Sequence, residues 1–209
     1  MKILILCTGN SCRSQMAHAF LQSFDKNLIV RSAGTEAAGK LNAGAVKVMA
    51  EAGIDISGYT SDPVEIYLGE EWDYVITVCG DADKTCPSFT GNVGTRLHIG
   101  FDDPSHVIAP PEFSDSEFRR VRDEIRGCFY RFFQENILLS YPDRCSADTM
   151  ICYCSGITLS DVRDAKLHGC RDIRQVRSYL GKNITGRCKI TSPDGRCCHS
   201  RFQAVLDSI

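Results

Sequence analysis

Apolar and polar positions in the first 140 residues alternate between short buried runs and helical stripes. The almost wholly apolar run at 3–6 is typical of a strand covered on both faces of a parallel sheet. Residues 14–24 then carry apolar side chains at spacings of three and four, which predicts an amphipathic helix. The alternation continues with predicted strands at 28–32, 74–78 and 96–99 and predicted helices at 42–52 and 114–139.

Strands that alternate with helices in this way predict an α/β fold. Right-handed crossovers would build a doubly wound sheet of about four parallel strands. Ligands of such sheets bind at the carboxyl ends of the strands. We therefore expect the functional residues in the loops that follow the first, third and fourth strands.

The last part of the chain has a different pattern. Residues 141–143 are typical of a linker, and short capped helices are predicted at 158–169 and 172–180. Neither helix buries much apolar surface alone, so a unit of this size is a candidate for stabilisation by a metal. We predict two domains, 1–140 and 145–209, of which the second is a small helical metal-binding domain.

Composition and charge support this division. The chain has 209 residues, 43% of them hydrophobic, and a net charge of -2, which is typical of a globular protein and favours neither a nucleic-acid nor a membrane partner. Residues 1–144 hold 14 Lys and Arg against 20 Asp and Glu, whereas the remainder holds 10 against 6.

Cysteine is distributed even more unevenly, because seven of the 12 cysteines lie in the last 65 of the 209 residues. No apolar run approaches the length of a membrane span, and the N-terminal run is too short for a signal peptide. We therefore expect a cytoplasmic location. In that reducing compartment, clustered cysteines are more often metal ligands or redox catalysts than structural bridges.

The loop after the first predicted strand has the chemistry of an oxyanion site. Cys7 and Arg13 have the Cys-x5-Arg spacing, and such a loop at a helix N-terminus turns backbone N–H groups inward. The arginine grips two oxygens of a tetrahedral oxyanion, and the same field is expected to lower the pKa of Cys7 and make it a nucleophile. Gly9 and Asn10 suit unusual backbone angles, and Ser14 suits a hydrogen bond to the sulfur. The predicted oxyanion-binding residues are Thr8, Gly9, Asn10, Ser11, Cys12, Arg13 and Ser14.

The run Cys-Thr-Gly-Asn-Ser-Cys-Arg-Ser at 7–14 resembles the nucleophile loop of the low-molecular-weight phosphotyrosine phosphatase superfamily, and above all its arsenate reductase branch. The resemblance covers about residues 1–140. It implies an acid aspartate in an Asp-Pro pair, which Asp103 and Pro104 match. Such an acid gives a proton to the leaving oxygen.

Two further thiols favour a reductase over a phosphatase. A phosphatase needs water to complete its reaction, whereas a reductase needs two electrons, which a series of thiols supplies by thiol-disulfide exchange. The thioredoxin-linked arsenate reductases carry a cysteine pair with the spacing of Cys79 and Cys86. The resemblance implies reduction of arsenate, a role in arsenic resistance, and thioredoxin or another thiol reductant as partner. The catalytic residues that it implies are Cys7, Arg13, Cys79, Cys86 and Asp103.

Two alternatives stay open at this point. One is a low-molecular-weight protein-tyrosine phosphatase with incidental extra thiols, and the other is a redox or metal sensor whose loop only binds an oxyanion. Potassium is left unassigned. Family members that bind it use an acidic side chain where this chain has His18, although oxygens of Asn10, Ser32, Thr60 and Asp62 are still available.

The cysteines of the tail lie at the two ends of a predicted helical hairpin. The opening Cys-x-Cys and the closing Gly-Arg-Cys-Cys resemble the bacterioferritin-associated-ferredoxin-like [2Fe-2S] domain, particularly the version found in some copper chaperones. The resemblance implies a [2Fe-2S] cluster, with zinc as the alternative. The implied metal ligands are Cys152, Cys154, Cys188 and one of Cys197 and Cys198.

Overall fold

The computed structural model describes residues 1–106, 111–183 and 185–209, and the chain forms two compact units. The first unit contains Met1–Gln22 and Leu28–Cys128, and the second contains Ser23–Asn27 and Phe129–Ile209. The predicted linker at 141–143 lies inside the second unit. The domain bounds expected from the sequence stay a prediction.

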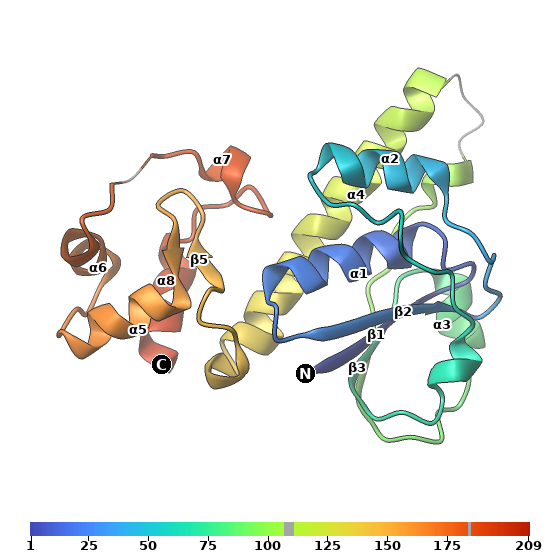
Figure 1. Cartoon of the computed structure of the whole chain (residues 1–209), viewed down its shortest axis with the longest axis horizontal. Helices are drawn as coiled ribbons and strands as arrows, with labels where there is room; N and C mark the ends of the chain where they lie inside the picture. Colours follow the sequence, from blue (N-terminus) through green and yellow to red (C-terminus); the bar gives the residue numbers. More distant parts are fainter. Residues whose placement is uncertain (107–110, 184) are drawn as a thin grey trace. The chain divides into compact units, whose positions relative to one another are not determined.

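A four-stranded parallel sheet forms the centre of the first unit (Figure 1). The register pairs Cys7 with Gly34 and Leu6 with Thr77, so the carboxyl ends of the strands meet at one edge. This sheet confirms the predicted α/β fold with four parallel strands. Its strands, in the order β2-β1-β3-β4, are β1 (Lys2–Cys7), β2 (Ile29–Gly34), β3 (Trp72–Thr77) and β4 (Val93–His98).

Helices and single turns connect these strands or follow β4. The predicted helices at 14–24 and 42–52 agree with the structure to within a residue, whereas the short α3 was not predicted. The elements are α1 (Arg13–Phe24), α2 (Ala43–Glu51), α3 (Gly80–Thr85), α4 (Pro111–Phe133), the 3-10 turns Val64–Tyr67 and Pro104–His106, and the π-helical turn Gln134–Leu138 that continues α4.

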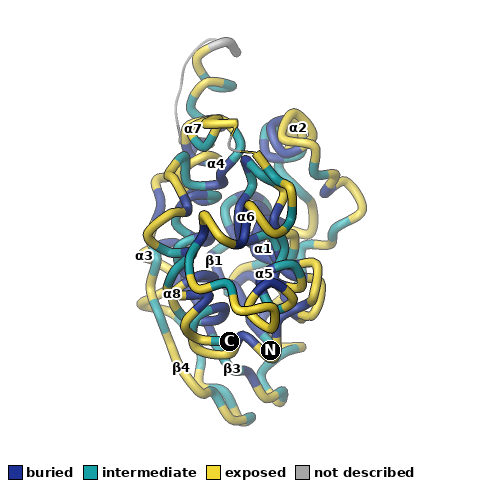
Figure 2. The backbone as a smooth tube through the Cα atoms, turned by 90° about the vertical axis from the view of Figure 1, so that its left-hand side faces the viewer, coloured by how far each residue is buried: buried dark blue, intermediate teal, exposed yellow. Residues whose placement is uncertain are grey.

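The core of the first unit is built around β1. Residues 3–6 have no exposed surface, which the dark blue of buried residues illustrates in Figure 2. On one face of the sheet Leu4 and Leu6 pack in a cluster with Trp72 and Val75. β1 is buried from Ile3 onward, so its final residue, Cys7, lies buried at the sheet edge.

Apolar side chains also form a stripe along α4. A side chain of this kind contributes about 1.5–3 kcal/mol to the free energy of unfolding when it is fully buried. The stripe predicted from the sequence is confirmed, since all of its members are at most 5% exposed: Phe118, Val121, Ile125, Phe129 and Phe132.

The second unit combines a small antiparallel hairpin with short helices. Thr158 and Asp161 form the predicted capping box, and Gly181 ends α6 with a φ of 64°. The C-terminal α8 was not predicted, and it buries Phe202 and Val205. The elements are β5 (Met150–Cys152), β6 (Ile157–Thr158), α5 (Leu159–Leu167), α6 (Ile173–Leu180), α7 (Cys188–Thr191) and α8 (His199–Ser208).

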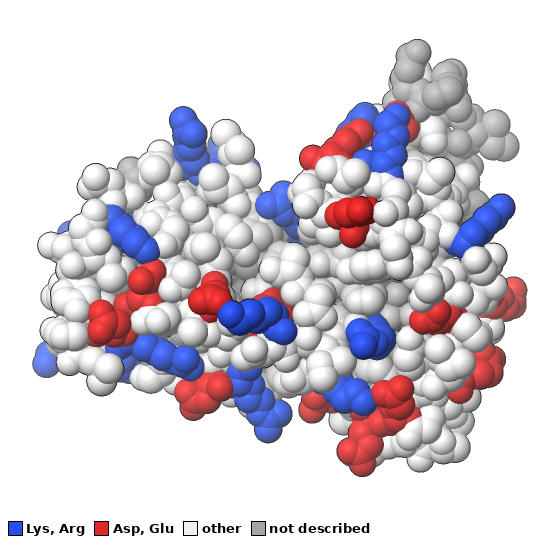
Figure 3. Space-filling view, in the orientation of Figure 1, with Lys and Arg blue, Asp and Glu red and all other residues white. Residues whose placement is uncertain are grey.

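Charged side chains of both signs are interspersed over the face drawn in Figure 3. Within the described residues, no helix is both long and apolar enough to cross a membrane.

A methyl group added at Gly34, where β2 ends, would lie 2.5 Å from the carbonyl oxygen of Thr8. We predict that Gly34→Ala lowers the free energy of unfolding by about 1–3 kcal/mol, because backbone of the oxyanion loop has to move. Urea unfolding followed by fluorescence of Trp72, the single tryptophan, measures this in the first unit.

The matched control is Gly58→Ala. A Cβ at Gly58 meets nothing within 4 Å, so stability should be nearly unchanged. If both variants unfold at the same urea concentration, the close approach at Gly34 does not constrain the loop.

Candidate active site

The loop between β1 and α1 is organised around Asn10. Asn10 is fully buried and has a φ of 44°, a left-handed conformation that asparagine tolerates better than most residues. Its Nδ2 donates to Ser14 Oγ at 2.9 Å, and its Oδ1 accepts from the amide of Asp62 at 2.8 Å. The unusual backbone angle expected at Asn10 is confirmed. The one expected at Gly9 is wrong, because Gly9 has no positive φ.

The thiol of Cys7 is held inside this loop. Its Sγ accepts a hydrogen bond from the Asn10 amide at 3.1 Å and lies 2.9 Å from Ser14 Oγ. Asn10 Nδ2 also donates to this hydroxyl oxygen, so Ser14 links the Asn10 side chain to the sulfur. Ser14 therefore plays the part expected of it.

Burial raises the pKa of the Cys7 thiol, and the hydrogen bonds with Ser14 and the Asn10 amide oppose that rise. The prediction that the loop lowers the pKa of Cys7 is wrong for the loop by itself. Cys7 is only 3% exposed, and desolvation disfavours the thiolate. The groups that favour the thiolate are Ser14 and Asn10.

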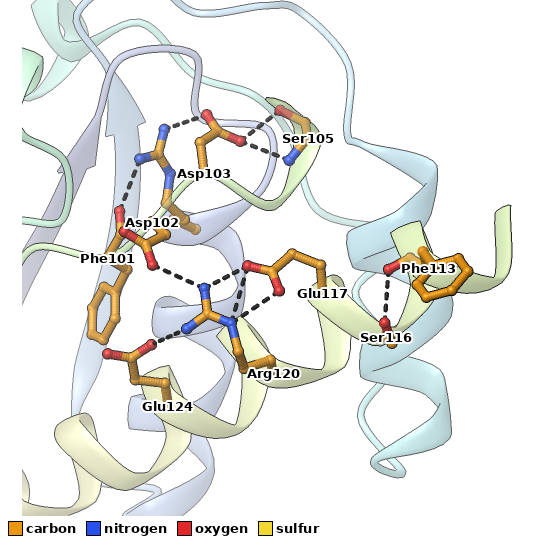
Figure 4. A network of polar contacts seen from close by, with 10 residues as sticks. Phe101, Asp102, Asp103, Ser105, Phe113, Ser116, Glu117, Arg120 and Glu124 are labelled. Atoms are coloured by element: carbon orange, nitrogen blue, oxygen red, sulfur yellow. Dashed lines mark hydrogen bonds and ion pairs between the residues drawn. The ribbon is translucent and has the colours of Figure 1, made fainter. Parts of the chain in front are cut away.

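Arg13 and Asp103 form an ion pair at the mouth of the loop. Arg13 Nη2 donates to Asp103 Oδ2 at 2.6 Å, and Nη1 donates to the carbonyl of Phe101 at 3.1 Å. The other carboxylate oxygen of Asp103 accepts from the amide of Ser105 at 2.9 Å and from its hydroxyl (Figure 4). The structure thus brings the predicted acid and the predicted oxyanion-binding arginine together.

A cavity of about 450 Å³ opens at this point. Asn10 and Ser14 are not among its lining residues: the Asn10 side chain binds Ser14 and the Asp62 amide, and the Ser14 hydroxyl lies beside the Cys7 sulfur. That these two residues contact the oxyanion stays a prediction. The cavity is lined by Cys7, Thr8, Gly9, Ser11, Cys12, Arg13, Cys79, Gly80, Asp81, Asp103 and Ser105.

Cys79 belongs to the cavity and Cys86 does not. Cys79 precedes α3, is 5% exposed, and its Sγ lies 3.4 Å from Thr8 Oγ1. Cys86 follows the same helix, is half-buried, and lies 3.9 Å from a guanidinium nitrogen of Arg96. Residues at the two ends of such a helix lie about 10 Å apart along its axis.

A second cavity, of about 380 Å³, lies beside His18. Burial lowers the pKa of His18 to about 4, so its ring is neutral near pH 7. Its Nδ1 lies 3.2 Å from Ser32 Oγ. Thr60 and Asp62 line the cavity with Ser32, whereas Asn10 does not.

The five predicted tail ligands lie near one another in the second unit. Cys152 Sγ and Cys154 Sγ are 3.7 Å apart. A hydrogen bond with Cys198 lowers the pKa of Cys152. Burial raises the pKa of Cys188 to about 11, and hydrogen bonds with Cys154 and Cys197 act in the same direction.

These contacts join the five thiols in one connected set. Among residues 1–106, 111–183 and 185–209, however, no group of three or more His, Cys, Asp or Glu has an arrangement ready to hold a metal ion. Sequence reasoning also missed a charged neighbour of the set, Arg177, which is 9% exposed and whose Nη2 donates to Cys152 Sγ at 3.6 Å.

Known proteins resemble the first part of the chain. An arsenate reductase of Shouchella clausii is 49% identical over 131 residues, covering 62% of this chain and 93% of the relative. One of Bacillus cereus is 50% identical over 131 residues, covering 62% and 92%. A solved arsenate reductase in the oxidized state has 30% identity and a TM-score of 0.53, covering 62% of this chain and 94% of its own.

The family described as low molecular weight phosphotyrosine protein phosphatase matches residues 2–137. That range contains the whole parallel sheet, the loop from Cys7 to Arg13 and the paired Asp103. Through these residues the chain belongs to the low molecular weight phosphotyrosine protein phosphatase family.

Proposed function

We propose that this protein reduces arsenate to arsenite with thiols as the source of electrons. The observation that carries the proposal is a second buried thiol, Cys79, in the wall of the cavity that holds Cys7 and Arg13. Relatives about half identical in sequence are named arsenate reductases. A role in arsenic resistance follows from this activity.

In the first step the Cys7 thiolate attacks arsenate and a sulfur-arsenic bond forms. The oxyanion takes the donors of Arg13, which in the structure are bound to Asp103 and Phe101. Loss of the arginine partner leaves Asp103 able to take up a proton and to pass it to the departing oxygen, which leaves as water.

In the second step the Cys79 thiolate attacks the sulfur of Cys7. A disulfide forms between them, and the sulfur-arsenic bond breaks with its electron pair on arsenic, so arsenite is released. The position of Cys79 in the wall of the cavity suits this attack. Arsenic is reduced by two electrons, and two thiols are oxidised.

In the third step Cys86 attacks Cys79 and frees Cys7. A disulfide joins Cα atoms less than about 7 Å apart, whereas Cys79 and Cys86 lie at opposite ends of the six-residue α3. We infer that α3 unwinds as this bond forms. Only Ala82 is buried within α3, so little packing opposes the change.

The cycle then needs an external reductant. We propose thioredoxin or another small dithiol, since the disulfide formed by Cys79 and Cys86 requires two electrons to reopen. A reducing cytoplasm would supply such a partner.

A phosphatase would use the same loop, arginine and acid. That alternative gives no function to Cys79 or Cys86, and neither does a sensor that only binds oxyanion. The cavity wall at Cys79 therefore favours the reductase.

We expect Cys86→Ser to release roughly one arsenite per chain and then stop, because the disulfide between Cys7 and Cys79 is not resolved. Arsenite released with a thioredoxin system and mass spectrometry of the trapped disulfide measure this. The control is Cys128→Ser, which removes a half-buried thiol outside the cavity and should turn over normally. Continuous turnover by Cys86→Ser would reject the relay.

We further propose that the tail holds a [2Fe-2S] cluster in a ferredoxin-like helical domain, with zinc as the alternative occupant. The number and type of donors suit either group, because both take four thiolates and five thiols form one connected set. Binding would have to draw four of them together, since the described residues hold no arrangement ready for a metal ion. At a zinc-sulfur distance of about 2.3 Å, two thiolates of a tetrahedral site lie about 3.8 Å apart, and the Sγ atoms of Cys152 and Cys154 are 3.7 Å apart.

The chain's own residues would supply the ligands and part of the charge balance. Cys152, Cys154 and Cys188 would bind with Cys198, which is buried, or Cys197, which is exposed. Arg177 would offset negative charge beside Cys152. A bound group of this kind supplies either electron transfer, as a cluster, or structural stability, as zinc.

We expect protein purified without oxygen to contain either two irons and two sulfides, with visible absorption, or one colourless zinc. Cys152→Ser should lose most of that metal, because a buried central ligand is removed. Cys170→Ser is the matched control and should keep it, since Cys170 is outside the connected set of thiols. Metal analysis and absorption spectra distinguish the cluster from zinc. Equal metal content in the two variants would contradict the assignment of Cys152 as a ligand.

A further inference from the structure

Two consecutive aspartates of the loop after β4 bind two different arginines. Asp103 binds Arg13 of the oxyanion loop at 2.6 Å, and Asp102 binds Nη2 of Arg120, on α4, at 2.9 Å. Figure 4 shows the Asp102 side chain directed toward Arg120 and the Asp103 side chain directed toward Ser105. The segment that carries the acid is therefore attached both to the oxyanion loop and to a long helix.

Arg120 is held in place by its own helix. Its Nε donates to both carboxylate oxygens of Glu117 at 3.0 Å, and its Nη1 donates to Glu124 at 3.2 Å (Figure 4). These residues lie three positions before and four positions after Arg120, the spacings at which helical side chains meet. Because Glu117 and Glu124 orient the guanidinium, the contact with Asp102 requires little further ordering.

Arg120 is the shared cation of an exposed cluster, in which its side chain is 47% and that of Asp102 77% exposed. Three carboxylates, those of Asp102, Glu117 and Glu124, surround one guanidinium. With the arginine present, Asp102 is attracted to α4. Without it, Asp102 faces two like charges and is repelled, so the loop loses an anchor and gains a repulsion.

The two attachments act at different stages of the proposed reaction. Arg13 cannot bind Asp103 and the arsenate oxygens with the same donors, so substrate weakens the first attachment. Arg120 lines neither the arsenate cavity nor the surroundings of Cys7. Oxyanion binding therefore does not compete directly for the contact between Arg120 and Asp102.

We propose that Arg120 is a positioning residue that keeps the Asp103 acid at the cavity while Arg13 binds the oxyanion. This inference rests on the proposed arsenate reduction. It assigns to α4 a role in proton delivery that is separate from substrate binding.

The test compares Arg120→Gln with Arg119→Gln in the full-length protein. Arg119 is the adjacent residue of α4 and pairs with Glu51 through two hydrogen bonds, away from the acid loop. Arsenate-dependent loss of free thiols in a single turnover gives the maximal rate and the arsenate concentration at half saturation.

We expect Arg120→Gln to lower the maximal rate about three- to tenfold, because general acid catalysis depends on placement of the acid. The arsenate concentration at half saturation should be unchanged, since Arg13 and the loop amides are intact. Arg119→Gln should match the wild type in both. In the wild type, added salt should lower the rate in part toward that of Arg120→Gln, because exposed charges are screened.

A second variant keeps the test valid if Arg120→Gln folds poorly. Asp102→Asn leaves the helix unchanged and should lower the maximal rate in the same direction. The double variant Asp102→Asn with Arg120→Gln should be no slower than Arg120→Gln alone, because the neutral side chain removes the repulsion. Thermal unfolding of each variant identifies losses that are only structural.

The outcomes separate the two proposals. If the wild type loses no thiols with arsenate, the arsenate reductase function fails, and the role of Arg120 fails with it. If the wild type reacts and Arg120→Gln equals Arg119→Gln, or if folded Asp102→Asn equals the wild type, only the positioning role is overturned. The positioning role would also be overturned if Arg120→Gln changed only the arsenate concentration at half saturation and left the maximal rate unchanged.

Discussion

The geometry of the active-site loop depends on the side-chain amide of Asn10. Its two ends bind Ser14 on α1 and the Asp62 amide, so the left-handed backbone at Asn10 is stabilised from both sides. That conformation brings the Asn10 N–H toward the Cys7 sulfur, which also lies within hydrogen-bond distance of Ser14 Oγ. The nucleophile is thus placed by a buried polar network at the end of a strand that is buried from Ile3 onward, where the hydrogen bonds oppose the desolvation that disfavours its reactive form.

Two arginines pair with the two aspartates of the acid loop, Asp102 and Asp103. Arg13 is shared between the oxyanion and Asp103, whereas Arg120 holds the neighbouring Asp102 from α4. In the proposed reaction, the dianion replaces Asp103 as the partner of Arg13 and leaves the contact between Arg120 and Asp102 unchanged. One loop can therefore release its acid for proton transfer and still keep it in place, because its two aspartates have separate cationic partners.

The thiols of the protein fall into two sets with different surroundings. Cys7 and Cys79 share a cavity with an arginine and an acid, which suits nucleophilic chemistry. The tail thiols contact mainly one another, with Arg177 as the nearby cation, which suits four-thiolate binding of a metal group. The tail has short helices and a two-stranded hairpin, so a bound metal would add the stability that such a small core lacks.

The sequence by itself determined the four parallel strands, the apolar stripe of α4 and the place of the loop from Cys7 to Arg13 after the first strand, because hydrophobic period and residue spacing are local properties. It failed at α3, whose Gly-Asp-Ala-Asp-Lys-Thr run has no apolar stripe, and at α8, although Phe202 and Val205 have helical spacing. Only the tertiary structure decided that Cys86 lies apart from Cys79 and that Asp102 pairs with Arg120, 18 residues away. Such pairings depend on how helices and loops converge at the sheet edge, and no local pattern in the chain encodes that convergence.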